Sequence, residues 1–162
     1  MPDAPPADPD APLMLDRFLP YRLAVLANTV SKGIARLYAD RFGITIPEWR
    51  ILAILGAFGA ATASEIQGRS AMDKVQVSRA IARLTEAGMI RRTIDAADRR
   101  RQTIAMTSEG ERVYREIVPL AQAREAALLE GFSDEERTML DRLLDRLQAR
   151  AATGDATRDG TA

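Results

Sequence analysis

Residues 73–107 read DKVQVSRAIARLTEAGMIRRTIDAADRRRQTIAMT. Apolar residues in the first half recur at the i, i+4, i+7 spacing of an amphipathic helix, at Val77, Ile81 and Leu84. Gly88 follows, a residue that often ends a helix. The second half alternates apolar and polar residues on both sides of the charged run DAADRRR, which is typical of two strands joined by a loop. The stretch therefore predicts a helix over 74–87 followed by a β-hairpin over 89–107.

Helix starts on both sides of this stretch carry the pattern S/T-x-x-E, in which the hydroxyl and the carboxylate cap free N–H groups. The four pairs are Thr45–Glu48, Thr62–Glu65, Ser108–Glu111 and Ser133–Glu136. We expect six helices, at about 15–40, 46–57, 63–69, 74–87, 109–130 and 134–150. Pro119 is expected to kink the fifth. The order predicts a mainly α fold with a small β-wing, a winged helix-turn-helix.

Composition limits the chemistry. The chain has 162 residues, 46% of them hydrophobic, and no net charge, cysteine or histidine. These absences exclude disulfides, thiol nucleophiles, Cys/His metal sites and histidine catalysis. Carboxylate pairs such as Glu135–Glu136 fall at a helix start with no nucleophile–base pair beside them. We therefore expect no enzyme activity, no cofactor and no metal.

The ends of the chain differ from its middle. Residues 1–12 hold five of the eight prolines, and 153–162 are rich in small and polar residues. We expect both to be disordered tails around one folded domain at 13–152. The first 16 residues have no Lys or Arg, and no apolar run is long enough to span a membrane. We expect a cytoplasmic protein with no membrane partner.

Charge is concentrated between residues 69 and 101, which carry nine cations against four carboxylates. On a helical wheel of 74–87, Gln76, Arg79 and Arg83 share the face opposite the apolar one. A Gln amide can bond the adenine edge bidentately and Arg the guanine edge, in a major groove that admits one helix. Lys74 and Ser78 flank this face and suit phosphates. The alternative is an ordinary amphipathic surface helix.

The predicted hairpin loop strengthens the DNA interpretation. Arg99, Arg100 and Arg101 would repel one another at its tip without an anionic partner, and a narrow minor groove attracts inserted Arg. Asp98 can pair with one of them and stiffen the loop. A helix for the major groove beside a charged wing for the next groove favours double-stranded DNA as the partner. The rival function is a winged-helix module that binds protein, which would not need the arginine tip.

Residues 72–110 resemble the winged-helix core of the MarR family of bacterial transcriptional regulators. The resemblance is carried by Arg83-Leu84…Gly88, by Asp98-Arg99-Arg100 and by the closing run Met106-Thr107-Ser108-Glu109-Gly110. It implies a winged-helix lobe at about 46–107. Helices at about 15–40 and 108–150 would interlock two subunits in a homodimer that binds a pseudo-palindromic operator. By position, it implies that Gln76, Ser78 and Arg79 face the major groove and Arg99 the minor groove, while Asp98 and Arg100 shape the wing.

The resemblance also implies a small organic effector, because regulators of this family often release DNA when a molecule enters the cleft beside the dimer helices. Residues 19–52 resemble family members that control aromatic-acid catabolism, including that of hydroxycinnamates. This implies a repressor released by an aromatic carboxylate or its coenzyme A thioester.

The candidate effector contacts come from the first two helices and are Arg22, Arg36, Tyr38, Trp49 and Arg50. Aromatic rings stack on an aromatic ligand, and a guanidinium pairs with its carboxylate. Arg22 and Arg36 lie 14 residues apart, roughly 21 Å along a helix, so only a long ligand such as a thioester spans both. The alternative is that Trp49 belongs to the core and the arginines pair with Glu48 or Asp40.

Overall fold

The computed structural model describes residues 12–94 and 102–156. They form two compact units that meet in the sequence at Ala121 and Gln122. The elements are α1 (Leu19–Phe42), α2 (Ile46–Phe58), α3 (Ala63–Ser70), α4 (Lys74–Glu86), β1 (Ile90–Ile94), β2 (Gln102–Met106), α5 (Ser108–Leu128) and α6 (Asp134–Ala156). The predicted fold class, mainly helical with a small antiparallel wing, is confirmed.

Two element boundaries differ from the prediction. α1 begins at Leu19, with Pro20 in its first turn. Proline is tolerated there because the N–H groups of the first turn have no hydrogen-bond partner within the helix. α6 continues to Ala156, past the point at Thr153 where we expected a disordered tail to begin. A run of small and polar residues weakens helix propensity without ending a helix. α5 runs on through Pro119.

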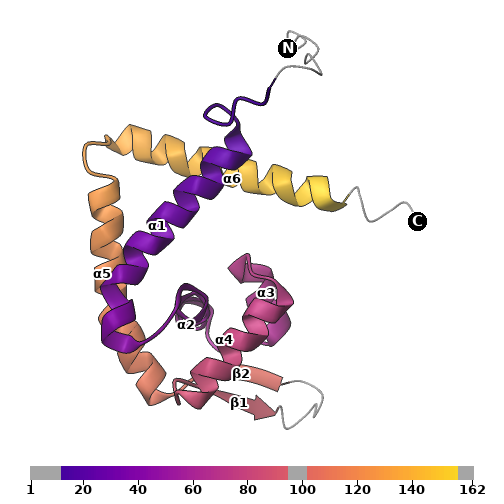
Figure 1. Cartoon of the computed structure of the whole chain (residues 1–162), viewed down its shortest axis with the longest axis vertical. Helices are drawn as coiled ribbons and strands as arrows, with labels where there is room; N and C mark the ends of the chain where they lie inside the picture. Colours follow the sequence, from indigo (N-terminus) through magenta and orange to yellow (C-terminus); the bar gives the residue numbers. More distant parts are fainter. Residues whose placement is uncertain (1–11, 95–101, 157–162) are drawn as a thin grey trace. The chain divides into compact units, whose positions relative to one another are not determined.

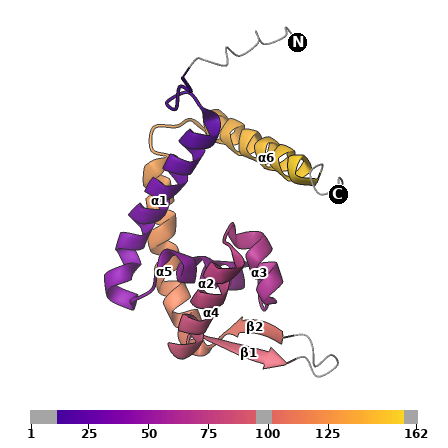
Figure 2. The ribbon, with the colours of Figure 1, turned by 45° about the vertical axis from the view of Figure 1, so that its right-hand side comes forward.

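In the first unit α2 is the centre of the packing. Figures 1 and 2 show α3, α4 and the hairpin gathered around it, with α1 and the first part of α5 on the other side. α2 is apolar on nearly all sides, as expected for a buried helix. Its Ile51 and Leu52 are fully buried, together with Ile66 of α3, Ile81 of α4 and Ile117 of α5. This core fixes α4 while leaving its outer face free.

The centre of the hairpin is hydrogen-bonded to the segment that leads into α3. β1 and β2 pair antiparallel from Ile90↔Met106 to Ile94↔Gln102. Ala61 extends the pairing by one bridge, because its N–H donates to the Ile104 carbonyl at 3.0 Å and the Ile104 N–H donates back at 2.8 Å. The wing is thereby held to the segment that leads into α3.

Many large apolar side chains of the first and last helices are exposed in the single chain. The exposed large apolar residues of α1 and the segment before it are Leu13, Met14, Leu15, Phe18, Leu19, Tyr21, Leu23, Val25, Leu26 and Leu37. Those of α6 in the second unit are Met139, Leu140, Leu143, Leu144 and Leu147. Across the described ranges, none of the helices combines the length and hydropathy needed to cross a bilayer.

Candidate nucleic-acid interface

α4 begins with a reciprocal cap. Asp73 Oδ1 accepts a hydrogen bond from the Gln76 N–H at 2.7 Å, and Gln76 Oε1 accepts one from the Asp73 N–H at 3.2 Å. Two N–H groups that a helix start would leave unpaired are satisfied in this way. The Gln76 side chain, predicted to face DNA, is therefore also part of the structure of the helix start.

The two faces of α4 separate cleanly. Val77, Ala80, Ile81 and Leu84 are buried against the core. The five residues predicted to face the major groove are all exposed: Lys74, Gln76, Ser78, Arg79 and Arg83. Val75, which the sequence argument passed over, is 56% exposed beside them. Val75 precedes Arg79 by four residues, about one helical turn, and this spacing could have placed it on the same face from the sequence.

Arg83 has a partner inside the protein. Its Nε lies 3.6 Å from Oε1 of Glu48, which is only 4% exposed at the start of α2. The other oxygen of that carboxylate accepts a hydrogen bond from the Thr45 N–H at 2.6 Å. The pair links α4 to α2, although 69% of the Arg83 side chain stays exposed. Contact between Arg83 and DNA remains a prediction.

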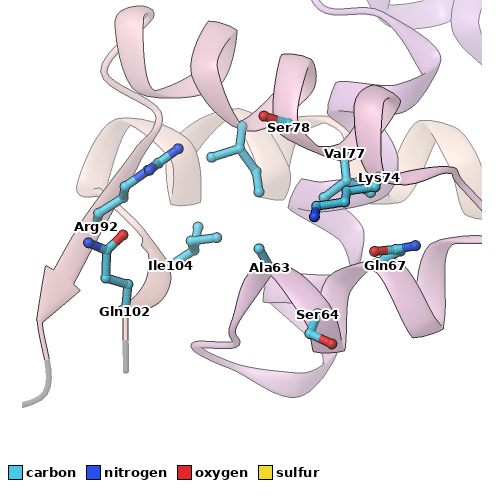
Figure 3. A pocket seen from close by; sticks show the side chains of 10 residues that line it. Ala63, Ser64, Gln67, Lys74, Val77, Ser78, Arg92, Gln102 and Ile104 are labelled. Carbon is cyan, nitrogen blue, oxygen red and sulfur yellow. The ribbon is translucent and has the colours of Figure 1, made fainter. Parts of the chain in front are cut away.

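A hollow of about 460 Å³ lies between α3, α4 and the hairpin. Figure 3 shows Lys74 on its helical side and Arg92 on its strand side. Polar groups line the rest of the rim, and Val77, Ile81 and Ile104 form its apolar floor. Two cations facing one concave surface give it the character of a site for an anionic group.

Sequence reasoning missed Arg92 and Gln67 as members of this surface. Arg92 is one of the nine cations between residues 69 and 101, and the period-2 alternation of β1 places it on one face with Ile90. Gln67 follows Ser64 by three residues on α3, so both lie on one side of that helix. The four predicted wing residues, Asp98, Arg99, Arg100 and Arg101, lie outside the described residues.

The aromatic effector candidates meet in the first unit. The rings of Tyr38 and Trp49 lie 5.7 Å apart, and Tyr114 of α5 stacks on Trp49 at 6.0 Å with an interplanar angle of 25°. Gly56 makes room for Tyr114, because a Cβ there would lie 2.3 Å from the phenol ring. The sequence prediction, which drew the effector contacts from the first two helices, missed Tyr114 of α5.

The three charged effector candidates differ in burial. Arg50 is half-buried near Tyr38, while Arg22 and Arg36 are exposed on α1. Burial raises the pKa of the Tyr38 phenol to about 12, against the opposing Arg50 charge and with the Glu48 charge adding to it. Tyr38 is 1% exposed, so it belongs to the core, and its phenol is neutral at physiological pH. Its ring contacts that of Trp49.

Comparisons with known proteins agree on one family. A sequence model of the MarR family matches residues 42–101. The HTH-type transcriptional regulator PecS of Dickeya dadantii is 32% identical over 78% of this chain and 77% of its own. A MarR/EmrR family transcriptional regulator from Acinetobacter is 29% identical in its crystal structure, with a TM-score of 0.81 over 87% of this chain and 99% of that one.

A third similarity concerns the fold alone. Bordetella bronchiseptica BpsR, studied for regulation of its DNA binding by 6-hydroxynicotinic acid, is 22% identical with a TM-score of 0.74 over 85% of this chain and 98% of its own. The winged arrangement of α3, α4 and the hairpin, the exposed cationic face of α4 and these matches lead to one assignment. The chain belongs to the MarR family of winged-helix transcriptional regulators.

Proposed function

We propose that this protein is a cytoplasmic repressor that binds a pseudo-palindromic operator as a homodimer and releases it on binding an aromatic carboxylate or its coenzyme A thioester. The observation that carries the DNA-binding part is the outer face of α4. That face presents Gln76, Ser78 and Arg79 to solvent, while the opposite face is locked into the core. One exposed helix face of this kind is what a major groove admits.

Backbone contacts would surround this face. Lys74 and Arg92 are placed on opposite sides of the hollow, where a phosphate that follows the edge of the major groove would meet both. The hairpin would carry Arg99 and its neighbours Arg100 and Arg101 toward the adjacent minor groove, with Asp98 stiffening the loop. Arg83 would also contact DNA through the exposed part of its side chain, while its Nε stays close to Glu48.

A second copy of the chain is the proposed cover for the uncovered apolar residues. α1 and α6 each expose a run of large apolar side chains between 37% and 54% accessible. Monomeric soluble proteins rarely leave such continuous apolar surface in water. A two-fold dimer would bury both runs and present two copies of α4, which is why the proposed operator is an inverted repeat.

The effector site is proposed around Trp49. Its indole is half-buried, stacked on Tyr114 and tilted against Tyr38, and adjacent in sequence to the half-buried Arg50. An aromatic ring and a guanidinium side by side suit an aromatic carboxylate. Only a long thioester would span both of the exposed arginines of α1, Arg22 and Arg36. BpsR, which shares the fold, is regulated by an aromatic acid.

Selection from a random duplex pool at near-physiological salt tests the DNA-binding proposal. We expect enrichment of an inverted repeat whose half-sites lie about one helical turn apart. Folded, dimeric protein that enriches no sequence would overturn this function and favour the protein-interaction module.

Fluorescence of the single tryptophan tests the effector proposal. Hydroxycinnamates and their coenzyme A thioesters are titrated into the protein alone and into its complex with the selected duplex. We expect Trp49 emission to change and the DNA to be released over the same concentration range. If both stay constant across the series, this effector class is excluded, while the DNA-binding proposal stands.

A further inference from the structure

Val75 places an apolar side chain at the centre of the outer face of α4. The residues of α4 that are buried in the core are Val77, Ala80, Ile81 and Leu84. On a helical wheel Val75 lies opposite the midpoint of these four. It is the second residue of the helix and is 56% exposed. Recognition helices contact base edges through their N-terminal residues, so Val75 lies where such contacts are made.

This exposure is unusual in the winged-helix part of the chain. Between Ile46 and Met106, the described residues include two exposed large apolar side chains, Phe58 and Val75. The Arg69 guanidinium lies over the Phe58 ring, 4.7 Å from its centroid, so Phe58 has a partner within the protein. Val75 lies on a face with exposed polar and cationic residues, and valine forms helices less readily than the long polar residues do. Local stability therefore does not explain a valine at this position.

The neighbours of Val75 indicate which partner it meets. Lys74 precedes it, and Arg79 follows one helical turn later on the same face. Both side chains are exposed. An apolar group among cations suits a polyanion that also carries an apolar contact point, and DNA is such a partner. A purely apolar protein surface would leave the two cations without a counter-charge.

The chemistry of valine limits what it can recognise in DNA. Its side chain has no hydrogen-bond donor or acceptor, and the apolar group in the major groove is the C5-methyl of thymine. Over the donors and acceptors of the other bases, valine would displace water without replacing its hydrogen bonds. Valine in a helix has one strongly preferred χ1 rotamer, so its two methyl groups are held in one arrangement before binding.

We propose that Val75 is a specificity residue that selects a thymine in each half-site by packing against its C5-methyl group. The inference rests on the proposed entry of α4 into the major groove. It adds an apolar contact to the hydrogen-bonding contacts proposed for Gln76 and Arg79. Each half-site would then be read by shape as well as by donors and acceptors.

Removal of methyl groups from the DNA and from the protein tests the proposal. Deoxyuridine in place of the selected thymine removes only the C5-methyl. We expect wild-type affinity to fall by roughly fourfold for each half-site changed, the effect of exposing about one buried methyl group. Val75→Ala removes both γ-methyl groups and keeps a residue that favours helices. This variant should bind the thymine and deoxyuridine operators within about twofold of each other, because the two losses share one contact.

Methylated cytosine gives a second readout. A cytosine–guanine pair at the selected position changes the hydrogen-bonding edge and lacks the methyl group, and 5-methylcytosine restores the methyl group alone. Methylation should recover roughly fourfold in affinity for the wild type and have little effect on Val75→Ala. Phe58→Ala is the matched control, because it removes the other exposed apolar side chain of this region and should discriminate thymine from deoxyuridine as the wild type does. Thermal melts establish that all three proteins are folded.

Two outcomes overturn the proposal. The first is site selection in which the wild type and Val75→Ala enrich the same bases with the same preference. The second is an equal loss of affinity in both proteins when deoxyuridine replaces thymine, which would mean that the methyl group contacts another residue. A wild type that enriches no sequence is a different result, because it overturns the proposed function itself.

Discussion

Replacing Arg79 with alanine is expected to lower the affinity for the selected operator by roughly 5- to 100-fold and to relax base preference at one position of each half-site. Arg79 is exposed on the outer face of α4. Its neighbours in sequence, Val77 and Ala80, are buried on the opposite face. The substitution removes a planar donor group and leaves the packing of the helix untouched. Titration of the protein into labelled operator and into single-base variants measures both effects.

Charge and geometry are separated by a second substitution at the same position. Arg79→Lys keeps the positive charge, so the slope of log affinity against log salt should stay close to that of the wild type. The lysine lacks the two-pronged fork, so base discrimination at that position should still fall. In Arg79→Ala the salt slope should fall as well, by about one charge.

A matched control removes a cation elsewhere. Arg115 is exposed on α5, 4.0 Å from Glu111, in the same compact unit but on neither α3, α4 nor the hairpin. Arg115→Ala should bind the operator within about twofold of the wild type, since exposed pairs of this kind contribute little. If Arg79→Ala binds the operator and its variants as the wild type does, α4 is not the recognition helix.

The sequence predicted the elements of this interface because local rules determine them. Capping patterns marked the starts of α2, α3 and α6, and a change from helical to period-2 spacing marked the wing. Both signals depend on residues within a few positions of each other. The exposed face of α4 followed from the same wheel that placed Val77 and Ile81 in the core.

The finer features depended on contacts that sequence patterns do not record. Glu48 and Arg83 are separated by 35 positions and meet only because α2 packs on α4. The stacking of Tyr114 on Trp49 needs the space above Gly56. The second role of Gln76 was within reach, because Asp73-x-x-Gln76 fits the capping pattern once Asp and Gln are allowed in it.

The joint between α4, the hairpin and α5 gives the largest stability prediction. Thr107, just before α5, donates its hydroxyl to the Gly88 carbonyl at 2.6 Å and its N–H to the Met89 carbonyl at 3.0 Å. The Gly110 N–H in turn donates to the Thr107 hydroxyl at 3.2 Å. These bonds hold the first turn of α5 directly against the turn that ends α4.

Gly110 has no room for a side chain at this joint. A Cβ there would lie 2.0 Å from the Met89 carbonyl oxygen and 3.0 Å from its carbon, both backbone atoms that cannot rotate away. Gly110→Ala therefore has to move α5 away from the turn and break the bonds around Thr107. We expect a loss of about 3 kcal/mol in the free energy of unfolding, at the upper end of the usual cost of overpacking. For a chain of this size, the melting temperature should fall by roughly 6–12 °C in a thermal melt followed by circular dichroism.

Gly68→Ala is the matched control, since Gly68 lies inside α3 with no atom within 4 Å of an added Cβ. The same chemical change there should raise stability by about 0.5–1 kcal/mol, because alanine favours the helix and restricts the unfolded chain. The two variants thus differ in sign for one added methyl group, and the difference isolates the contact with Met89. If Gly110→Ala had the same melting temperature as the wild type, the start of α5 would not pack against the α4–β1 turn. In that case the wing would lack the support on which the proposed approach of Arg92 to a phosphate depends.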